Sequence, residues 1–340
     1  MKGLWKYLAP FASDQSGATA VLYGLGGLVV ICDAGGCAGN ICSFDEPRWF
    51  SGERSAVFSA GLREIDAILG RDDQLVAKVQ AAAGAVDADF AALVGTPVPA
   101  VIGTDFRGLE HLAEKRLGLP VVAIDTTGMV RYDAGIGKAY KALLKKFARK
   151  DVTIKKGTVN VLGAVPLDLC HPGDEDTLVP ALEAQGWQQI RLFHCLEDYR
   201  LAGEAERSIA LSPAGLTAAK WLQTRFGIPY ECRYTDVTAL AERIAAATAP
   251  EDSILVVHQS VGAYALKKAL EVRGRPQVTT ATWFQPLPGD IALKEEDDFI
   301  TLVRSHGFRA LAADAHLWRA VPDFRGLLVD FPHYAVSGRR

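Results

Sequence analysis

The sequence predicts an α/β protein made of repeated doubly wound units, each a parallel sheet covered by helices. Short apolar strands alternate with longer amphipathic helices along all 340 residues, which is the pattern of parallel βαβ units. Hydrophobic residues make up 49% of the chain and charged residues 23%, so the protein can bury a large core. A lysine-rich stretch at 145–156 and an alanine-rich helix at 237–247 interrupt the alternation. The predicted domains are therefore 1–150, 151–246 and 247–340.

The elements of the first predicted domain follow from local runs of apolar residues. Strands are short runs of Val, Ile, Leu and Ala, whereas helices place apolar residues three and four positions apart. The predicted strands are 28–32, 90–94 and 121–124, and the predicted helices are 62–69, 74–83, 107–116 and 138–147.

The other two predicted domains repeat this pattern. The second has predicted strands at 158–162, 189–193, 209–211 and 230–234, and predicted helices at 177–185 and 214–225. The third has predicted strands at 253–258, 279–284 and 327–331, and predicted helices at 263–273 and 297–306. In such sheets, ligands bind beyond the carboxyl ends of the strands. The segments at these ends are 32–42, 95–99, 125–128 and 163–166.

Composition and motifs exclude several functions. The formal net charge is −3 and no basic block dominates one face, which argues against a nucleic-acid partner. The apolar run 17–31 is too short to span a bilayer, and Asp14 before it is unfavourable in a secretory signal, so we expect no membrane association. Six cysteines, three of them clustered, do not resemble a secreted disulfide framework, which favours a reducing cytoplasm. No G-x-x-x-x-G-K-[ST] loop occurs, so we do not expect this chain to hydrolyse ATP.

Three cysteines in a glycine-rich turn form the main candidate site. Cys32, Cys37 and Cys42 follow a predicted strand at intervals of five residues. Thiolates are soft ligands that select iron–sulfur clusters, zinc or copper(I). Gly36 and Gly39 would let the backbone approach a bulky group. Free cysteines are also often buried as small hydrophobic residues, so a metal-binding role and a packing role both stay open.

Other side chains near predicted strand ends are candidates for catalysis or docking. Asp33 is an oxygen ligand or hydrogen-bond partner in one interpretation and the cap of a turn in the other. His258 would face a cleft between domains and donate a proton to a substrate, or it is a structural histidine. Arg48 beside Trp49 is typical of an interface that docks a reductase or receives an anionic substrate, with a surface loop as the alternative.

An ordered set of segments resembles the nitrogenase component 1 type oxidoreductases. The segments are SGA at 16–18, Gly36-Cys37, AVFSAGL at 56–62, VIGTD at 101–105, VLGAVP at 161–166 and FGIPY at 226–230. Gly36-Cys37 is similar to the glycine–cysteine cluster turn of that family, and AVFSAGL is similar to the start of a family helix. Together these segments span most of the chain, and their order and spacing make the resemblance specific.

The resemblance implies repeated Rossmann-like α/β units and an oxygen-sensitive iron–sulfur cluster at a subunit interface. It also implies a separate ATP-dependent iron protein that binds the ATP and delivers electrons one at a time. Members of the family reduce dinitrogen or C=C bonds of tetrapyrroles, process sulfur compounds, or act as scaffolds for cofactor assembly.

The chain departs from the family pattern at the cluster ligands. Of the three cluster cysteines of the first domain, only Cys37 carries over, because Ser13 and Pro97 stand at the other two positions. The late cysteine and histidine that hold the active-site cofactor have no match. We therefore do not expect this chain to reduce dinitrogen.

A two-fold dimer would double every ligand that one chain provides. Cys37 with Cys42 or Cys32 from each copy would supply the four thiolates of a 4Fe-4S cluster. The expected function is the catalytic component of a two-component reductase, acting on a small or tetrapyrrole-like substrate as a homodimer or with a sister subunit. The alternatives are a scaffold for metallocofactor or cluster assembly and a cluster-free α/β ligand-binding protein.

Overall fold

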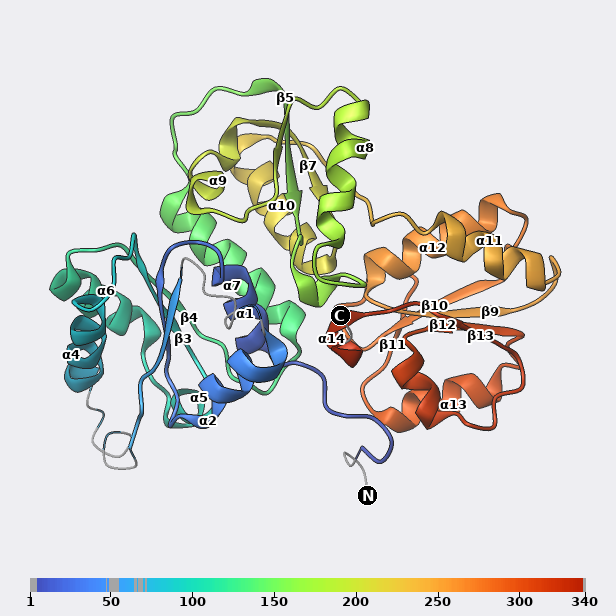
Figure 1. The fold of residues 1–340 in the computed structure, drawn as a ribbon, viewed down its shortest axis with the longest axis horizontal. Coiled ribbons are helices and arrows are strands. Elements are labelled where there is room, and N and C mark those ends of the chain that lie inside the picture. Colours follow the sequence, from blue (N-terminus) through green and yellow to red (C-terminus); the bar gives the residue numbers. More distant parts are fainter. Residues whose placement is uncertain are drawn as a thin grey trace.

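The computed structural model describes residues 5–46, 48, 55–63, 66, 70 and 72–338. Its strands form three sheets, and neighbouring strands within every sheet run parallel. The predicted α/β class with parallel sheets is therefore confirmed. Figure 1 shows the three sheets as three lobes, with the C-terminal helix α14 (Tyr334–Ser337) between them.

The first sheet has the strand order β2-β1-β3-β4. Its strands are β1 (Leu28–Ile31), β2 (Ala56–Ser59), β3 (Ala91–Val94) and β4 (Val121–Ile124). Both β1 and β3 are buried along their whole length, as expected for central strands covered on both faces. The covering helices are α1 (Asp14–Leu22) and α7 (Tyr132–Phe147) on one face and α4 (Asp72–Ala83) and α6 (Phe106–Leu117) on the other.

The second sheet has the strand order β6-β5-β7-β8. Its strands are β5 (Lys155–Leu162), β6 (Gln189–Arg191), β7 (Ala205–Ala210) and β8 (Tyr230–Cys232). Its helices are α8 (Leu178–Ala184), α9 (Leu196–Arg200) and α10 (Pro213–Phe226). Helix α10 begins at Pro213 with Ser212 as its cap and ends at Phe226, and Gly227 follows as the C-terminal cap. The sequence shows both the proline at the start and the glycine after the end.

The third sheet has the strand order β11-β10-β9-β12-β13. Its strands are β9 (Ile254–Val257), β10 (Val278–Thr282), β11 (Ile291–Ala292), β12 (Ala310–Ala313) and β13 (Leu327–Asp330). Its helices are α11 (Thr238–Ala247), α12 (Ser260–Val272) and α13 (Glu296–Ser305). The three sheets fall within the three predicted domain ranges, whose boundaries stay predictions.

Several elements differ from the sequence-based expectations. The segment that resembles a helix start contains strand β2, which pairs with β1 through Val57 and Phe58, residue types that favour strands. The glycine-rich turn at 36–45 is helical, with α2 (Gly36–Asn40) running into the π-helical turn η1 (Ile41–Asp45). Most of the predicted helix 62–69 lies outside the described residues, as does Trp49.

Within the described ranges, no helix combines the length and hydrophobicity needed to cross a membrane.

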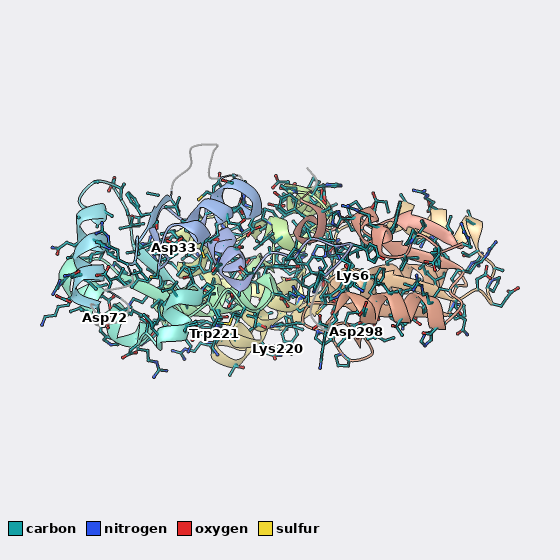
Figure 2. All side chains as sticks on the ribbon, turned by 90° about the horizontal axis from the view of Figure 1, so that it is seen from below. Lys6, Asp33, Asp72, Lys220, Trp221 and Asp298 are labelled. Carbon is teal, nitrogen blue, oxygen red and sulfur yellow. The ribbon has the colours of Figure 1, made fainter. Side chains whose placement is uncertain are left out.

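The N-terminal segment ties the first domain to the third. Figure 2 shows Lys6 beside the third domain, and the backbone N–H groups of Lys6, Tyr7 and Leu8 all donate to the Glu296 carboxylate at 2.9–3.3 Å. Glu296 is the first residue of α13 and is buried. Negative charge is favourable at a helix N-terminus. The Glu296 carboxylate therefore stabilises the start of α13 and also accepts the hydrogen bonds of the N-terminal segment.

Replacing Glu296 by glutamine is expected to lower the free energy of unfolding by about 2 kcal/mol, because the amide has one acceptor oxygen and no charge for three donors. Urea unfolding measures this change, and limited proteolysis should cut the N-terminal segment faster. Asp297→Asn alters the exposed neighbour and should stay within about 0.5 kcal/mol of the wild type. Equal stability of both variants would contradict the role of the carboxylate.

Candidate functional site

The cysteine-bearing segment begins where strand β1 ends, at the carboxyl edge of the first sheet. Asp33 follows the strand and is almost fully buried. Its Oδ2 accepts a hydrogen bond from the Ala38 amide at 2.8 Å, and its Oδ1 accepts one from the Ser59 hydroxyl at 2.5 Å. Both carboxylate oxygens therefore hold α2 against β2. This geometry supports the capping interpretation of Asp33 over a role as a metal ligand or catalytic group.

Replacing Asp33 by alanine is expected to destabilise the protein by about 2 kcal/mol, because two hydrogen bonds to a buried carboxylate are lost. Asp125→Ala is the matched control, since its carboxylate is mostly exposed and forms a surface ion pair with Lys138 at 3.3 Å. Exposed pairs contribute about 0–1 kcal/mol. Chemical unfolding of both variants tests the difference, and an Asp33 variant no weaker than the control would refute the capping role.

Cys32 and Cys37 lie on opposite faces of the first sheet. Leu28, Val30 and Cys32 belong to the core cluster beneath α4 and α6, whereas Cys37 packs against the cluster that contains Val29 and the residues of α1 and α7. Strand side chains alternate between faces, and Cys32 continues the alternation of β1 by one residue. The two thiols therefore cannot meet on one face of a single chain.

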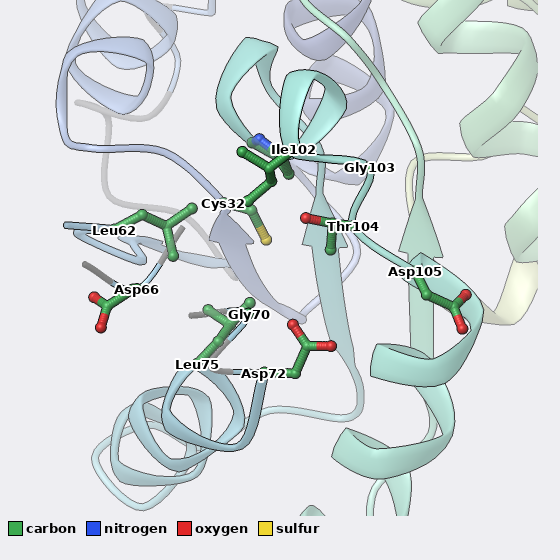
Figure 3. Close-up of a pocket in the computed structure, with 11 residues that line it drawn as sticks. Cys32, Leu62, Asp66, Gly70, Asp72, Leu75, Ile102, Gly103, Thr104 and Asp105 are labelled. Carbon is green, nitrogen blue, oxygen red and sulfur yellow. The ribbon is translucent and has the colours of Figure 1, made fainter. Parts of the chain in front are cut away.

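Cys32 faces a cavity of about 260 Å³ on the sheet face that α4 and α6 cover. Figure 3 shows its sulfur pointing towards the space that Asp72 and Thr104 also line. Burial, followed by the nearby Asp33, raises the pKa of the Cys32 thiol to about 12. A thiol with so high a pKa stays protonated at neutral pH and is a poor nucleophile. Burial, Asp105 and Asp73 also raise the pKa of Asp72.

Cys37 and Cys42 are both half-buried on the helical segment after β1. Ile41, fully buried between them, anchors the segment to the core. Burial and then the neighbouring Glu46 raise the pKa of the Cys42 thiol. Among the described residues, no group of three His, Cys, Asp or Glu side chains is arranged to hold a metal ion.

The surface around Cys37 is open and rich in glycine. A Cβ atom added at Gly35, Gly36 or Gly39 would meet no other atom within 4 Å. Gly35 has φ +118°, which requires glycine, but Gly36 and Gly39 lie in or at the start of a helix. A helical glycine costs about 1 kcal/mol relative to alanine, and no contact within the described chain explains that cost. The glycines leave a flat, accessible backbone on both sides of Cys37.

The two positions where the resemblance leads us to expect further cysteines, Ser13 and Pro97, lie at the same carboxyl edge of the sheet. Ser13 caps α1 without a side-chain hydrogen bond, and Pro97 begins α5 (Pro97–Ile102) and lies against Gly128. The amide of Gly128 donates to Asp14 at 2.6 Å, and the buried Gln15 Oε1 beside it has no hydrogen-bond partner among the described residues. This edge thus contains an unsatisfied polar atom, and neither Ser13 nor Pro97 supplies a thiol there.

His258 is buried where the three domains meet. Its ring stacks on Phe331 and His333 with centroids 4.1 and 4.3 Å apart, and its Nε2 lies 2.9 Å from the Pro332 carbonyl. Burial lowers the pKa of His258 to about 4, so the ring is neutral near pH 7. This environment supports a structural role for His258 over the alternative of a proton donor to a substrate, and we propose the structural role.

Three further buried groups at this junction were missed by the sequence analysis. Tyr132 donates or accepts a hydrogen bond with His333 Nε2 at 2.9 Å. Burial raises the pKa of Asp168 to about 7, with Ser212 and Tyr132 lowering it in part. Among the described residues, neither carboxylate oxygen has a partner with good hydrogen-bond geometry. The sequence offered one signal for Asp168, namely its position shortly after strand β5. Functional groups commonly lie beyond the carboxyl ends of parallel strands.

Comparison with known proteins gives one family and a set of similar structures. The family model described as "Nitrogenase component 1 type Oxidoreductase" matches residues 13–253. No curated protein matches the chain. The solved structure titled "Nitrogenase Cp1 at pH 6.5" has a TM-score of 0.73 and 14% identity, covering 97% of this chain and 87% of that one. "Nitrogenase Cp1 at pH 5" has a TM-score of 0.72 and 15% identity, covering 98% and 85%. At these identities the structural likeness concerns the fold alone.

Proposed function

Because the chain belongs to the nitrogenase component 1 type oxidoreductase family, we propose that it is the iron–sulfur component of a two-component reductase. In this proposal it receives electrons from an ATP-dependent iron protein and passes them to a small or tetrapyrrole-like substrate. The observation that carries the proposal is the open, glycine-lined surface around Cys37, the cysteine whose turn resembles the cluster turn of the family.

The residues fit a cluster shared between two copies better than one enclosed in a single chain. A four-iron cluster takes four thiolates, and Cys37 and Cys42 are the two that one helical segment provides. A two-fold axis beside α2 would bring both residues of each copy together. The cluster, when bound, supplies one-electron transfer. Asp33 would fix the segment that presents Cys37, and Gly36 and Gly39 would leave room for the close approach of the second copy.

Exposed apolar side chains near this edge support a covering partner. Val101 on α5 and Met129 beside Gly128 are 76% and 64% exposed, and the contact between Pro97 and Gly128 brings their two segments together. Large exposed apolar groups that cluster commonly mark an interface. We therefore propose a homodimer, or a pair with a sister subunit, in which this edge is buried.

The test of this function is reduction of the cluster by an iron protein of the family. Protein prepared without oxygen is mixed with the reduced iron protein, and visible absorption is followed after addition of MgATP or MgADP. We expect bleaching with MgATP alone, both for the wild type and for Cys232→Ala, whose cysteine is exposed on the second domain. A cluster that MgATP does not help to reduce would favour the scaffold for cluster assembly instead.

The second candidate is a cluster-free ligand-binding protein. The observation that favours it is the burial of Cys32 in the core with a raised pKa, because free cysteines often pack as small hydrophobic residues. Such a protein would retain the family fold, contain no iron when prepared without oxygen, and bind a ligand between its domains.

A further inference from the structure

A second cavity lies between the first and second domains. Its volume is about 260 Å³. One wall comes from the C-terminal end of α1, including Ala20 and Val21, and the other from the loops after β5 and β6, including Ala164, Val165 and Phe193. This is the carboxyl edge of the second sheet, where ligands bind in doubly wound folds.

The inner wall of the cavity is aromatic and rigidly held. Phe193 packs edge-on against Tyr199 and Tyr140, with ring centroids 4.9 and 6.0 Å apart. Phe193 has φ +63°, the one non-glycine residue of the described chain in the left-handed region, which costs about 1–2 kcal/mol. Its amide donates to Asp198 at 3.1 Å, and this bond helps to hold the loop.

The polar side chains at the cavity rim already contact other polar side chains. Arg48 makes two hydrogen bonds of 2.6 Å to Glu46 and lies over the Tyr23 ring at 4.2 Å. His194 Nε2 lies 3.6 Å from the carboxylate of Glu175, which is buried. A charged ligand would therefore compete with existing partners, whereas an uncharged ligand would leave both pairs intact.

One polar group of the inner wall is unsatisfied. The Tyr199 side chain is fully buried and lines the cavity, and its hydroxyl has no hydrogen-bond partner among the described residues. Burial keeps the pKa of Tyr199 well above its ordinary value, so the hydroxyl stays protonated. A buried hydroxyl without a partner is costly and accepts or donates one hydrogen bond to a suitable ligand.

We propose that this cavity binds a small uncharged aromatic molecule with one hydrogen-bonding group, which the Tyr199 hydroxyl recognises. The size agrees, because an engineered apolar cavity of about 150 Å³ holds benzene and this one measures about 260 Å³. The aromatic ring would lie against Phe193 and Val165, and the polar group would point to Tyr199. The proposal does not depend on whether the chain carries a cluster.

The experiment compares two probes that differ by one hydroxyl group, 4-fluorophenol and 4-fluorotoluene, by fluorine NMR titration of the full chain. We expect saturable one-site binding of 4-fluorophenol, with 4-fluorotoluene about fivefold to tenfold weaker, as one hydrogen bond of about 1 kcal/mol implies. In Tyr199→Phe the two probes should bind with nearly equal affinity. Tyr264→Phe removes an exposed tyrosine hydroxyl on α12 and should preserve the wild-type ratio.

A cavity-filling variant separates this site from unspecific binding. Ala164→Met should abolish binding of both probes, and circular dichroism verifies that the variant is folded. If Ala164→Met does not fold, Val21→Met on the opposite wall replaces it. Absence of saturable binding to the wild type, an unchanged probe ratio in Tyr199→Phe, or undiminished binding to the folded filled variant would each overturn the proposal.

Discussion

Replacing Cys37 by serine is expected to remove nearly all iron from protein prepared without oxygen. Cys37 lies half-buried on an open surface flanked by Gly36 and Gly39, and loss of one thiolate from each copy would leave two ligands for a cluster that takes four. Iron and acid-labile sulfide are measured on the same preparations as the wild type. Cys232→Ser, an exposed cysteine of the second domain, is the control and should retain the wild-type iron content.

The other two clustered cysteines should differ from each other. Cys42→Ser is expected to lower the iron content, because Cys42 lies on the same helical segment as Cys37. Cys32→Ser should leave the iron content unchanged and lower stability, because its thiol is buried in the opposite core. Loss of iron in a well-folded Cys32→Ser variant, with normal iron in Cys42→Ser, would contradict this assignment.

Replacing Asp168 by asparagine is expected to stabilise the protein at pH 8. Burial raises the pKa of Asp168 from 3.8 to about 7, so the folded state holds a buried negative charge above pH 7. The difference between these pKa values corresponds to up to about 4 kcal/mol, at 1.36 kcal/mol for each pKa unit. Asparagine is similar in size and never carries that charge.

The advantage of Asp168→Asn should shrink as the pH falls. Between pH 7 and 3.8 the folded wild type holds a proton on Asp168 that the unfolded chain releases, so lowering the pH stabilises the wild type through this group. Burial lowers the pKa of His258 and, with the charge of His258, that of His333. These two histidines therefore destabilise the folded protein as the pH falls below 6.5. The effect is the same in the wild type and in Asp168→Asn, so it cancels in the difference between their unfolding free energies.

Urea unfolding of the wild type and Asp168→Asn from pH 4 to pH 8 measures this difference. We expect a gain of several kcal/mol at pH 8 that approaches zero near pH 4. Asp125→Asn changes an exposed carboxylate of the first domain and should give a small, flat difference. A flat difference for Asp168→Asn as well would mean that its carboxyl group does not titrate between these limits.

The fold was predictable where the chain carries strong local signals. Strands β1, β3 and β9 are continuous apolar runs, and α10 has both its start and stop signals. Strand β12 was missed because its sequence, Ala310–Ala313, is mainly alanine, which favours helices when taken alone. It is a strand because it fills the space between β9 and β13 in the sheet.

The candidate site was only partly predictable. The cysteine spacing identified the segment, but that Cys32 shares the face of Leu28 and Val30 was seen only in the structure, where it continues the two-residue alternation of β1. The helical form of residues 36–45 was hidden by the glycines, which normally indicate a turn. Tyr132, Asp168 and His333 come together from three distant parts of the sequence, and no local pattern predicts such a contact.

The most direct test of the central claim is the iron and acid-labile sulfide content per chain, measured together with the mass in solution on wild-type protein prepared without oxygen. The proposed function predicts a dimer with about two irons and two sulfides for each chain, since two copies share one four-iron cluster. A folded protein without iron, or a monomer with a complete cluster of its own, would contradict the account.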